Sequence, residues 1–334
     1  MIVLGIETSC DETSCALVDH ALNIIANPIY SQLMEHSKYG GIVPEVASRQ
    51  QIRKILPLYR ECMCEARIGL NDVDAIAVTR GPGLIGSLLV GVNFAKGLAY
   101  ASGKPIIGIN HLEGHLLSNL LEHKNLKPPF LALIVSGGHT MLVLVEEICK
   151  YRILGQTRDD AAGEAYDKVA KLLGLSYPGG VMIDKLAADG DPGFFRFPRA
   201  KIKKGRFAFS FSGLKTAVVL YVRDKSDDFV KENMSNICAS FQEAVVDMLV
   251  SRCLTALDEF SLGQLAVAGG VAANSRLRTV LTESAARDGF EVFFPSIDLC
   301  TDNAAMIAAA GLMRYQRGER SDLSLDATAQ LPLQ

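Results

Sequence analysis

The sequence predicts an α/β protein built from two lobes of similar design. Apolar runs of strand length alternate with stretches of helical periodicity along most of the 334 residues, which is typical of α/β folds. One strand–turn–strand pattern also occurs twice, in residues 2–18 and 130–145, which indicates an internal duplication. Because 49% of the residues are hydrophobic, a chain of this length can bury one core in each lobe.

Each copy of the repeated pattern has a turn of small polar residues between two apolar strands. The strands are expected at residues 2–6 and 15–18 in the first copy, and at 130–135 and 141–145 in the second. Such turns can direct successive backbone N–H groups into one concavity, which binds phosphate without a lysine. A plain β-hairpin is the alternative for either copy alone, and two copies in corresponding places favour phosphate binding.

The remaining elements follow the same alternation of strand and helix. We expect strands at 75–79, 106–109, 264–268 and 291–294, and helices at 87–101, 111–121, 161–173, 181–188, 235–257, 274–286 and 301–314. The N-terminal lobe is predicted to span residues 1–110, with the C-terminal helix in 302–334 packing near or onto it. Residues 111–301 are predicted to form the C-terminal lobe, with a cleft between the two.

Bulk properties limit the classes of protein to which the chain can belong. The net charge is -3 with a pI of about 6.1, so any contact with nucleic acid must come from a local basic patch. No apolar run approaches the roughly 20 residues that span a bilayer, and no basic leader precedes the first strand, so we expect a cytoplasmic protein without membrane contact. The 8 cysteines lack the spacing of zinc or redox pairs, which predicts reduced thiols.

His111 and His115 are the most informative residues of the chain. They lie four positions apart in a predicted helix, and residues at that spacing share one helix face, where two imidazoles can bind one metal. Two ordinary helix positions are the alternative interpretation. A zinc-peptidase site is disfavoured, because Glu113 lies two residues after His111, about 200° around the helix, and not directly after it.

Four further positions each have a structural and a functional interpretation. Asp302 can cap the last helix or act as a third metal ligand. Asn274 can cap a helix or bond the ribose or base of a nucleotide. Asp167 can pair with Lys171 one turn further on, and Gly180 can belong to a helix stop or to a backbone that faces a ribose.

A basic and aromatic stretch precedes residue 215 and contains no acidic residue. Basic and aromatic side chains together suit the phosphates and exposed bases of RNA. A solvated basic loop with its phenylalanines in the core is the alternative. The residues concerned are Arg196, Arg199, Lys201, Lys203, Lys204, Arg206 and Lys215, with Phe194, Phe195, Phe197, Phe207, Phe209 and Phe211 between them.

The glycine-containing hairpins, together with a Gly-Gly turn that leads into a helix, resemble the two-lobed ATP-binding architecture of actin, hexokinases and Hsp70 chaperones (ASKHA). More specifically, eight motifs in order closely resemble the bacterial TsaD (Gcp) family. They are residues 5–13 (GIETSCDET), 110–115 (NHLEGH), 135–140 (VSGGHT), 161–168 (AAGEAYDK), 177–180 (YPGG), 209–215 (FSFSGLK), 268–274 (AGGVAAN) and 300–303 (CTDN). The chain departs from the family after Leu323, where the usual Arg-Pro-Arg-Trp-Pro run is missing.

The resemblance implies an acyltransferase that makes t6A. It implies transfer of a threonylcarbamoyl group from threonylcarbamoyl-AMP to N6 of the adenosine 3′ of the anticodon, in tRNAs that read codons beginning with A. The implied partners are tRNA, TsaB-like and TsaE-like proteins, and the implied cofactor is one divalent metal per subunit, with Fe²⁺ favoured and Zn²⁺ as the alternative. A kinase of the same fold, a metallopeptidase and a non-enzymatic nucleotide-sensing subunit are the competing functions.

The resemblance also carries site residues onto this chain. It implies His111, His115 and Asp302 as metal ligands, and as substrate-binding residues Ile134, Val135, Ser136, Gly137, Gly138, Asp167, Gly180, Asp184 and Asn274. It assigns no catalytic residue. Asp11 and Glu12 are candidates for the group that accepts the proton from N6, with a solvated turn as the alternative role.

Overall fold

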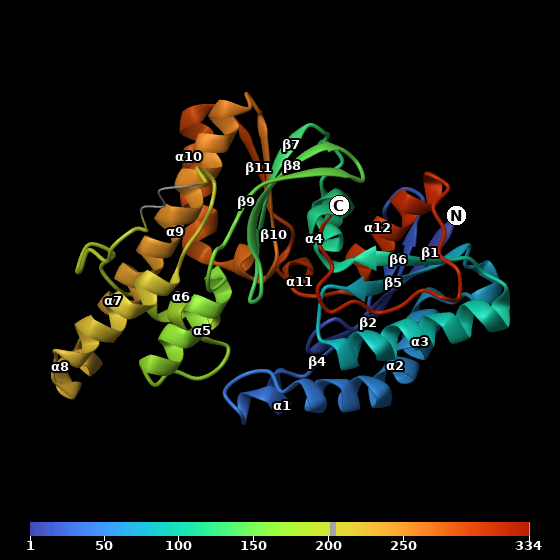
Figure 1. Ribbon diagram of the computed structural model, residues 1–334, viewed down its shortest axis with the longest axis horizontal. Coiled ribbons are helices and arrows are strands. Elements are labelled where there is room, and N and C mark those ends of the chain that lie inside the picture. The colour runs from blue at the N-terminus through green and yellow to red at the C-terminus, as the bar shows by residue number, and fades with distance from the viewer. Residues whose placement is uncertain (201–204, 334) are drawn as a thin grey trace. The chain divides into compact units, whose positions relative to one another are not determined.

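The chain folds into two compact units, each with its own sheet (Figure 1). The computed structural model describes residues 1–200 and 205–333. Unit 1 comprises Met1–Asn125, Ile148–Lys150 and Thr301–Gln334, and unit 2 comprises Leu126–Glu147 and Tyr151–Cys300. Each unit has its own hydrophobic core.

Unit 1 is a sheet in the order β3-β2-β1-β5-β6 with helices on both faces. The hairpin β1–β2 is antiparallel, whereas β5 and β6 run parallel to β1. Helices α2 and α3 cover one face and α12 the other (Figure 1). The elements are β1 (Ile2–Glu7), β2 (Glu12–Asp19), β3 (Ile24–Ala26), β4 (Ile29–Ser31), α1 (Leu33–Ser37), α2 (Pro44–Ala66), η1 (Leu70–Asp72), β5 (Ala75–Gly81), α3 (Ile85–Ser102), β6 (Ile106–Asn110), α4 (His111–Glu122) and α12 (Ala304–Gln316).

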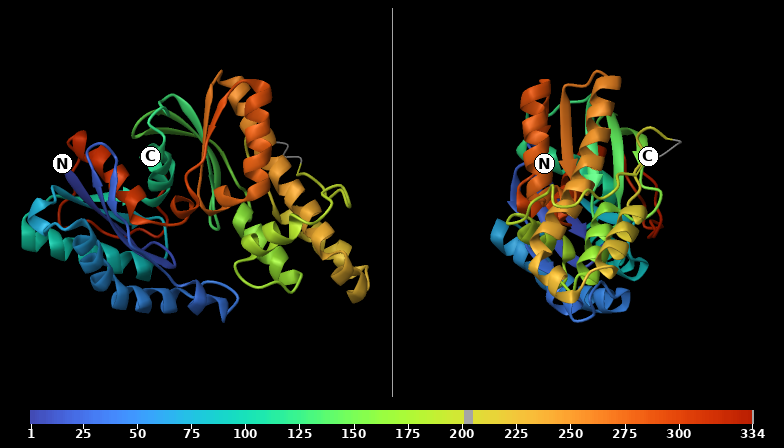
Figure 2. Two further views of the ribbon diagram at one scale, coloured as in Figure 1. Left: turned by 180° about the vertical axis from the view of Figure 1, so that it is seen from behind. Right: turned by 90° about the vertical axis from the view of Figure 1, so that its left-hand side faces the viewer.

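Unit 2 has a sheet in the order β11-β10-β7-β8-β9, with α9 and α10 packed along it (Figure 2). Its hairpin β7–β8 is antiparallel, whereas β10 and β11 continue parallel to β7. The elements are β7 (Phe130–Val135), β8 (Thr140–Glu147), β9 (Lys150–Gln156), α5 (Ala162–Leu172), α6 (Gly179–Ala187), α7 (Ser212–Arg223), α8 (Asp227–Glu232), α9 (Met234–Glu259), β10 (Gln264–Ala268), η2 (Gly270–Ala273), α10 (Ser275–Asp288), β11 (Glu291–Phe293) and α11 (Ile297–Cys300).

The two sheets repeat one topology. In each, an antiparallel hairpin is followed by two parallel strands on the side of its first strand, in the order β2-β1-β5-β6 and β8-β7-β10-β11. The predicted duplication is therefore confirmed at the level of strand order and direction. The corresponding turns are residues 8–11, between β1 and β2, and residues 136–139, between β7 and β8.

The structure differs from the sequence prediction in several places, and three of them bear on unit 1 and its histidine helix. The boundary between the units follows Asn125 and not residue 110, because α4 packs against α12 within unit 1. Helix α2, which was not predicted, begins with Pro44 at its first turn and covers the hairpin β1–β2. The last helix starts at Ala304, where the side chain of Asn303 caps it by accepting a hydrogen bond from the Met306 N–H.

Two bulk properties can be compared with expectation. All 8 cysteines are free thiols, as their spacing predicts. Within residues 1–200 and 205–333, none of the helices combines the length and the apolar character that crossing a membrane requires.

Candidate functional site

Helix α4 presents both histidines to one carboxylate in unit 1. Asn110 starts the helix by accepting a hydrogen bond from the Leu112 N–H on its side-chain oxygen, at 2.9 Å. The Nε2 atoms of His111 and His115 lie 3.5 and 3.1 Å from Oδ1 of Asp302. The three potential ligand atoms lie within 4.8 Å of one another, so one ion can contact all three.

A buried carboxylate that the sequence analysis missed orients His111. Glu7, at the end of β1, is 0% exposed, and its Oε2 lies 3.2 Å from His111 Nδ1. The Ser9 hydroxyl lies 3.1 Å from the same nitrogen, and the Thr79 hydroxyl donates to Glu7 Oε2 at 2.6 Å. A carboxylate on Nδ1 holds the proton there and leaves Nε2 available as a ligand. No spacing rule connects Glu7 with His111, and only the pairing of β1 with its neighbours brings them together.

The same carboxylates control the charge of His111. Burial lowers the pKa of His111, but the nearby Asp302 and Glu7 carboxylates outweigh it and raise the pKa to about 9. The His111 ring is therefore protonated at neutral pH when no metal competes for Nε2. This charge balances part of the negative charge of the two carboxylates.

Helices α4 and α12 pack closely against each other next to the potential metal ligands. Glu113 is 0% exposed, and its Oε2 accepts a hydrogen bond from Arg314 Nε at 2.7 Å. A Cβ added to Gly114 would lie 2.8 Å from Ile307 Cδ1, so a larger residue at this position would require the Ile307 side chain to move. Glu113 is thus engaged in a structural ion pair, which agrees with its exclusion as a peptidase base. Asp302 lies just before Asn303, the cap of α12, so the capping role considered for Asp302 is wrong.

The first turn, residues 8–11, is held from α2. The Nε2 of Gln51 donates to the carbonyls of Thr8, Cys10 and Glu12, at 3.1, 2.7 and 3.4 Å. The Glu12 side chain accepts a hydrogen bond from the Ser31 hydroxyl at 3.2 Å. Burial, followed by the charges of Asp11 and Asp302, raises the pKa of Glu12 well above its usual value. The first turn is therefore a closely fixed acidic segment.

The second turn, residues 136–139, is open and contains no carboxylate. It is closed by a hydrogen bond from the Ser136 N–H to the His139 carbonyl at 2.8 Å. Gly137 and Gly138 are exposed, and nothing lies within 4 Å of a Cβ added to either. Among the described residues, no partner accepts a hydrogen bond from either of their N–H groups. Ile134 and Val135, which precede the turn, are fully buried in β7.

The N-terminus of α5 lies against this second turn. The Gly163 N–H donates to the Ser136 carbonyl at 3.1 Å, and a Cβ on Gly163 would lie 2.8 Å from the Gly137 Cα. Further along α5, Asp167 Oδ1 accepts a hydrogen bond from the Gly179 N–H at 2.8 Å, which fixes the start of α6. Gly180 follows there and is half-buried. The structure thus brings Asp167 and Gly180 together at the junction of α5 and α6.

Asp184 and Asn274 form a second polar group in unit 2. Asn274 caps α10 by accepting the Leu277 N–H at 2.9 Å, so its predicted capping role is confirmed. Its Nδ2 donates to Asp184 Oδ1 at 3.0 Å and to Gln242 Oε1 at 2.7 Å. Gln242, which is 4% exposed, was not singled out from the sequence. All the predicted substrate-binding residues lie in unit 2, and all three predicted metal ligands lie in unit 1.

The basic and aromatic stretch is mainly structural in its described part. Four of its phenylalanines are buried in the core of unit 2, so the interpretation of the whole set as a base-stacking surface is wrong; they are Phe197, Phe207, Phe209 and Phe211. Arg199, Arg206 and Lys215 form ion pairs with Asp247, Glu259 and Asp160. Phe194 and Phe195 are each 36% exposed, and Arg196 is exposed. Lys201, Lys203 and Lys204 lie outside the described residues.

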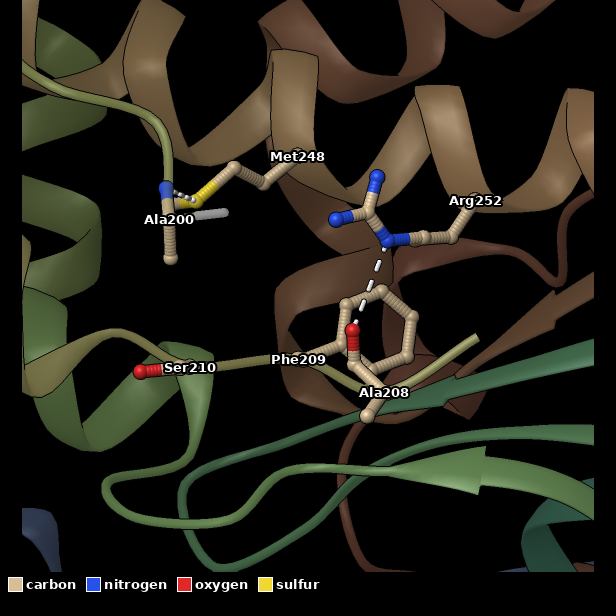
Figure 3. A pocket seen from close by; sticks show the side chains of 6 residues that line it. All are labelled: Ala200, Ala208, Phe209, Ser210, Met248 and Arg252. Atoms are coloured by element: carbon tan, nitrogen blue, oxygen red, sulfur yellow. Dashed lines mark hydrogen bonds between the residues drawn. The ribbon is translucent and has the colours of Figure 1, made fainter. Parts of the chain in front are cut away.

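Two residues of this stretch, one on each side of the three lysines, are hydrogen-bonded to α9 (Figure 3). Met248 Sδ accepts a hydrogen bond from the Ala200 N–H at 3.3 Å. Arg252 Nε donates to the Ala208 carbonyl at 3.4 Å. Both ends of the segment that contains the three lysines are thus attached to one long helix.

Comparison with solved structures shows the fold. The structure of T. kodakarensis HypF matches 95% of this chain and 48% of its own, with a TM-score of 0.66 and 14% sequence identity. The ROK hexokinase of Thermus thermophilus matches 96% of this chain and 100% of its own, with a TM-score of 0.50 and 16% identity. The fold and the residues in the two units therefore define a two-lobed ASKHA-type α/β protein, with a His–His–Asp group in one unit and an open glycine turn in the other.

Comparison of sequences shows the family. The model of the TsaD family, described as tRNA N6-adenosine threonylcarbamoyltransferase, matches residues 23–309. The tRNA N6-adenosine threonylcarbamoyltransferase of Clostridium botulinum (strain 657 / Type Ba4) is 49% identical over 331 residues, which are 99% of this chain and 97% of that protein. The chain belongs to the tRNA N6-adenosine threonylcarbamoyltransferase (TsaD) family, a family of transferases that modify tRNA.

Proposed function

We propose that the chain transfers threonylcarbamoyl from threonylcarbamoyl-AMP to N6 of the adenosine 3′ of the anticodon, in tRNAs that read codons beginning with A, with the help of a divalent metal. The observation that carries the proposal is the family match over most of the chain, together with a potential three-ligand metal group. TsaB-like and TsaE-like proteins are the proposed partners, and the cytoplasm is the proposed location.

The donor set of unit 1 fits a metal ion. Two neutral imidazoles and one carboxylate suit Fe²⁺ or Zn²⁺, and of these we favour Fe²⁺. His111, His115 and Asp302 would hold the ion, and Glu7 would fix the orientation and tautomer of His111. When bound, such an ion would act as a Lewis acid toward the carbonyl that is attacked.

The residues of unit 2 suit the nucleotide. Phosphate is already a good leaving group in a mixed anhydride, so the protein needs to bind AMP and stabilise the charge that develops on its phosphate. The N–H groups of Gly137 and Gly138, which have no acceptor among the residues that the structure describes, are suited to that charge. Asp167 and the backbone at Gly180 are proposed to hold the ribose, and Asp184 with Asn274 the remainder of the adenosine.

Transfer to N6 depends mainly on positioning, because the exocyclic amine of adenine is a weak nucleophile. We assign no general base. Asp11 and Glu12 stay candidates, and the raised pKa of Glu12 shows that its surroundings favour the proton-bearing form. Arg196, Phe194 and Phe195 are the described residues of the basic stretch that we propose for contact with tRNA.

The test is a transfer assay with threonylcarbamoyl-AMP, an unmodified tRNA and the two companion proteins, followed by mass spectrometry of the nucleosides. The account predicts threonylcarbamoyladenosine, and loss of the product in the double variant His111→Ala, His115→Ala. His20→Ala, which removes an exposed histidine from the same unit, serves as the matched control and is expected to keep full activity. Phosphoryl transfer from ATP to small acceptors without tRNA would instead identify a kinase, and metal-dependent cleavage of peptides a peptidase.

A further inference from the structure

The segment that follows α12 lies across unit 1 as an extended strap, residues 321–333. Its first attachment is at β6, where the Ser321 N–H donates to the Ile106 carbonyl at 2.8 Å and the Ser321 hydroxyl accepts the Gly108 N–H at 3.1 Å. Its middle is attached to the end of β5, where the Thr328 N–H donates to the Arg80 carbonyl at 2.7 Å. The strap is therefore held by hydrogen bonds along its length.

Unit 1 is shaped to receive this strap. A Cβ added to Gly81 would lie 2.0 Å from the Thr328 carbonyl oxygen, and a Cβ added to Gly108 would lie 2.5 Å from Leu325 Cδ1. Leu325 and Leu333 are 7% and 8% exposed, so the strap buries apolar side chains near its middle and its end. The backbone contact at Gly81, which only glycine allows, together with the buried leucines, shows that the strap has a specific binding position.

The end of the strap is bound by the residue that starts the histidine helix. Asn110 Nδ2 donates to the carbonyls of Leu331 and Pro332, at 3.3 and 3.0 Å. The Oδ1 of the same side chain accepts the Leu112 N–H and caps α4. One amide group thus joins the strap to the first turn of α4, where the next residue is the proposed ligand His111.

We propose that the strap is a positioning element of the metal centre and that Asn110 is the positioning residue through which it acts. When the strap is bound, three hydrogen bonds fix the amide plane of Asn110. They also fix the direction in which α4 continues from β6. Without the donation to the strap, the cap is retained but its amide can rotate, and His111 loses part of its alignment with His115 and Asp302. This proposal rests on the proposed metal site.

The variants Asn110→Ser and Asn110→Asp separate the two roles of the amide. Each keeps an oxygen that can cap α4, and neither can donate to Leu331 and Pro332 as the amide does. We expect both variants to bind Co²⁺ or Zn²⁺ about tenfold more weakly by calorimetry, the lower end of the range seen when groups behind metal ligands are removed. The melting temperature without metal is expected to stay close to that of the unaltered protein. Asn93→Asp makes the same chemical change at an exposed position of α3 and should leave metal affinity unchanged.

Leu333→Ala weakens the attachment of the strap by removing a buried side chain, and it leaves Asn110 unchanged. It is expected to weaken metal binding in the same direction. Linkage between two binding events is reciprocal, so saturating metal should also slow, by the same factor, amide hydrogen exchange at Thr328, the strap residue whose N–H donates to Arg80, in the unaltered protein.

Unchanged metal affinity in both Asn110→Ser and Leu333→Ala would overturn the positioning role, as would a loss confined to Asn110→Asp, where the new charge alone explains it. The result differs from failure of the metal site itself. In that case the unaltered protein would bind metal no better than His111→Ala, and both proposals would fall.

Discussion

The turns of the two hairpins occupy the same place in one repeated topology and have opposite character. The first turn, residues 8–11, contains Asp11 and is followed by Glu12. Gln51 donates hydrogen bonds to three backbone carbonyls in and next to this turn. The second turn, residues 136–139, presents two exposed glycines whose N–H groups are free among the described residues. The same backbone arrangement thus occurs twice with different residues. The first copy places Glu7 beside the proposed metal ligand His111, and the second exposes the glycines that are proposed to bind phosphate.

The strongest contrast lies in the residue that ends the first strand of each hairpin. β1 ends in Glu7, which contacts His111, whereas β7 ends in the apolar Val135. Glu7→Gln keeps the shape but removes the charge, and we expect metal affinity to fall by about 10- to 100-fold, because the Nδ1 proton of His111 is no longer held. Calorimetric titration with Zn²⁺ measures this change.

Thr79→Val provides the matched control for Glu7→Gln. It removes one hydrogen bond to Glu7 without removing its charge, and we expect a change in metal affinity of less than about threefold. Equal metal affinity in Glu7→Gln and the unaltered protein would show that Glu7 stabilises the fold and does not tune the site.

A second contrast uses one glycine behind each turn. A Cβ on Gly83 would lie 2.6 Å from the Ser9 carbonyl oxygen, and a Cβ on Gly163 would lie 2.7 Å from that of Ser136. Gly83→Ala should displace the first turn and weaken metal binding, and Gly163→Ala should displace the second turn and weaken AMP binding, each by about tenfold, equivalent to about 1.4 kcal/mol. Each variant should leave the other ligand's affinity nearly unchanged.

Gly97→Ala, on the exposed side of α3 with nothing within 4 Å of the added Cβ, controls for the substitution itself. It should leave both affinities unchanged and stabilise the helix by about 0.5–1 kcal/mol. If Gly83→Ala weakened AMP binding as much as Gly163→Ala does, the division of tasks between the turns would be wrong.

The smallest expected effect concerns Asn274. Asn274→Ser keeps a capping oxygen for α10 but removes the Nδ2 that bonds Asp184 and Gln242. We expect a nearly unchanged melting temperature and AMP affinity lower by about threefold to tenfold, since one or two hydrogen bonds that shape the site are lost. A fall in melting temperature with unaltered AMP affinity would show that Asn274 only caps α10 and does not shape the nucleotide site.

The sequence predicted the parts of this picture that depend on local periodicity. The hairpins, most of the helices and the shared face of His111 and His115 follow from spacing alone. It missed what depends on pairing between distant segments. Glu7 reaches His111 only because β1, β5 and β6 are neighbours, and α4 belongs to unit 1 because Glu113 and Gly114 meet α12.

Other misses arose where one pattern suits two environments. Phenylalanines that alternate with basic residues suit RNA or a core, and burial of Phe209 and Phe211 decides for the core. Asp302 and Asn303 are both common helix caps, and only the position of the Met306 N–H shows that Asn303 is the cap.

The central claim is that unit 1 holds a metal through His111, His115 and Asp302. Anomalous scattering from crystals grown with Co²⁺ tests it most directly. We expect one strong peak at about 2.0–2.2 Å from Nε2 of both histidines and from an oxygen of Asp302. A crystal in which the ion binds elsewhere, and in which His111 Nε2 contacts Asp302 and no metal, would contradict the proposed site.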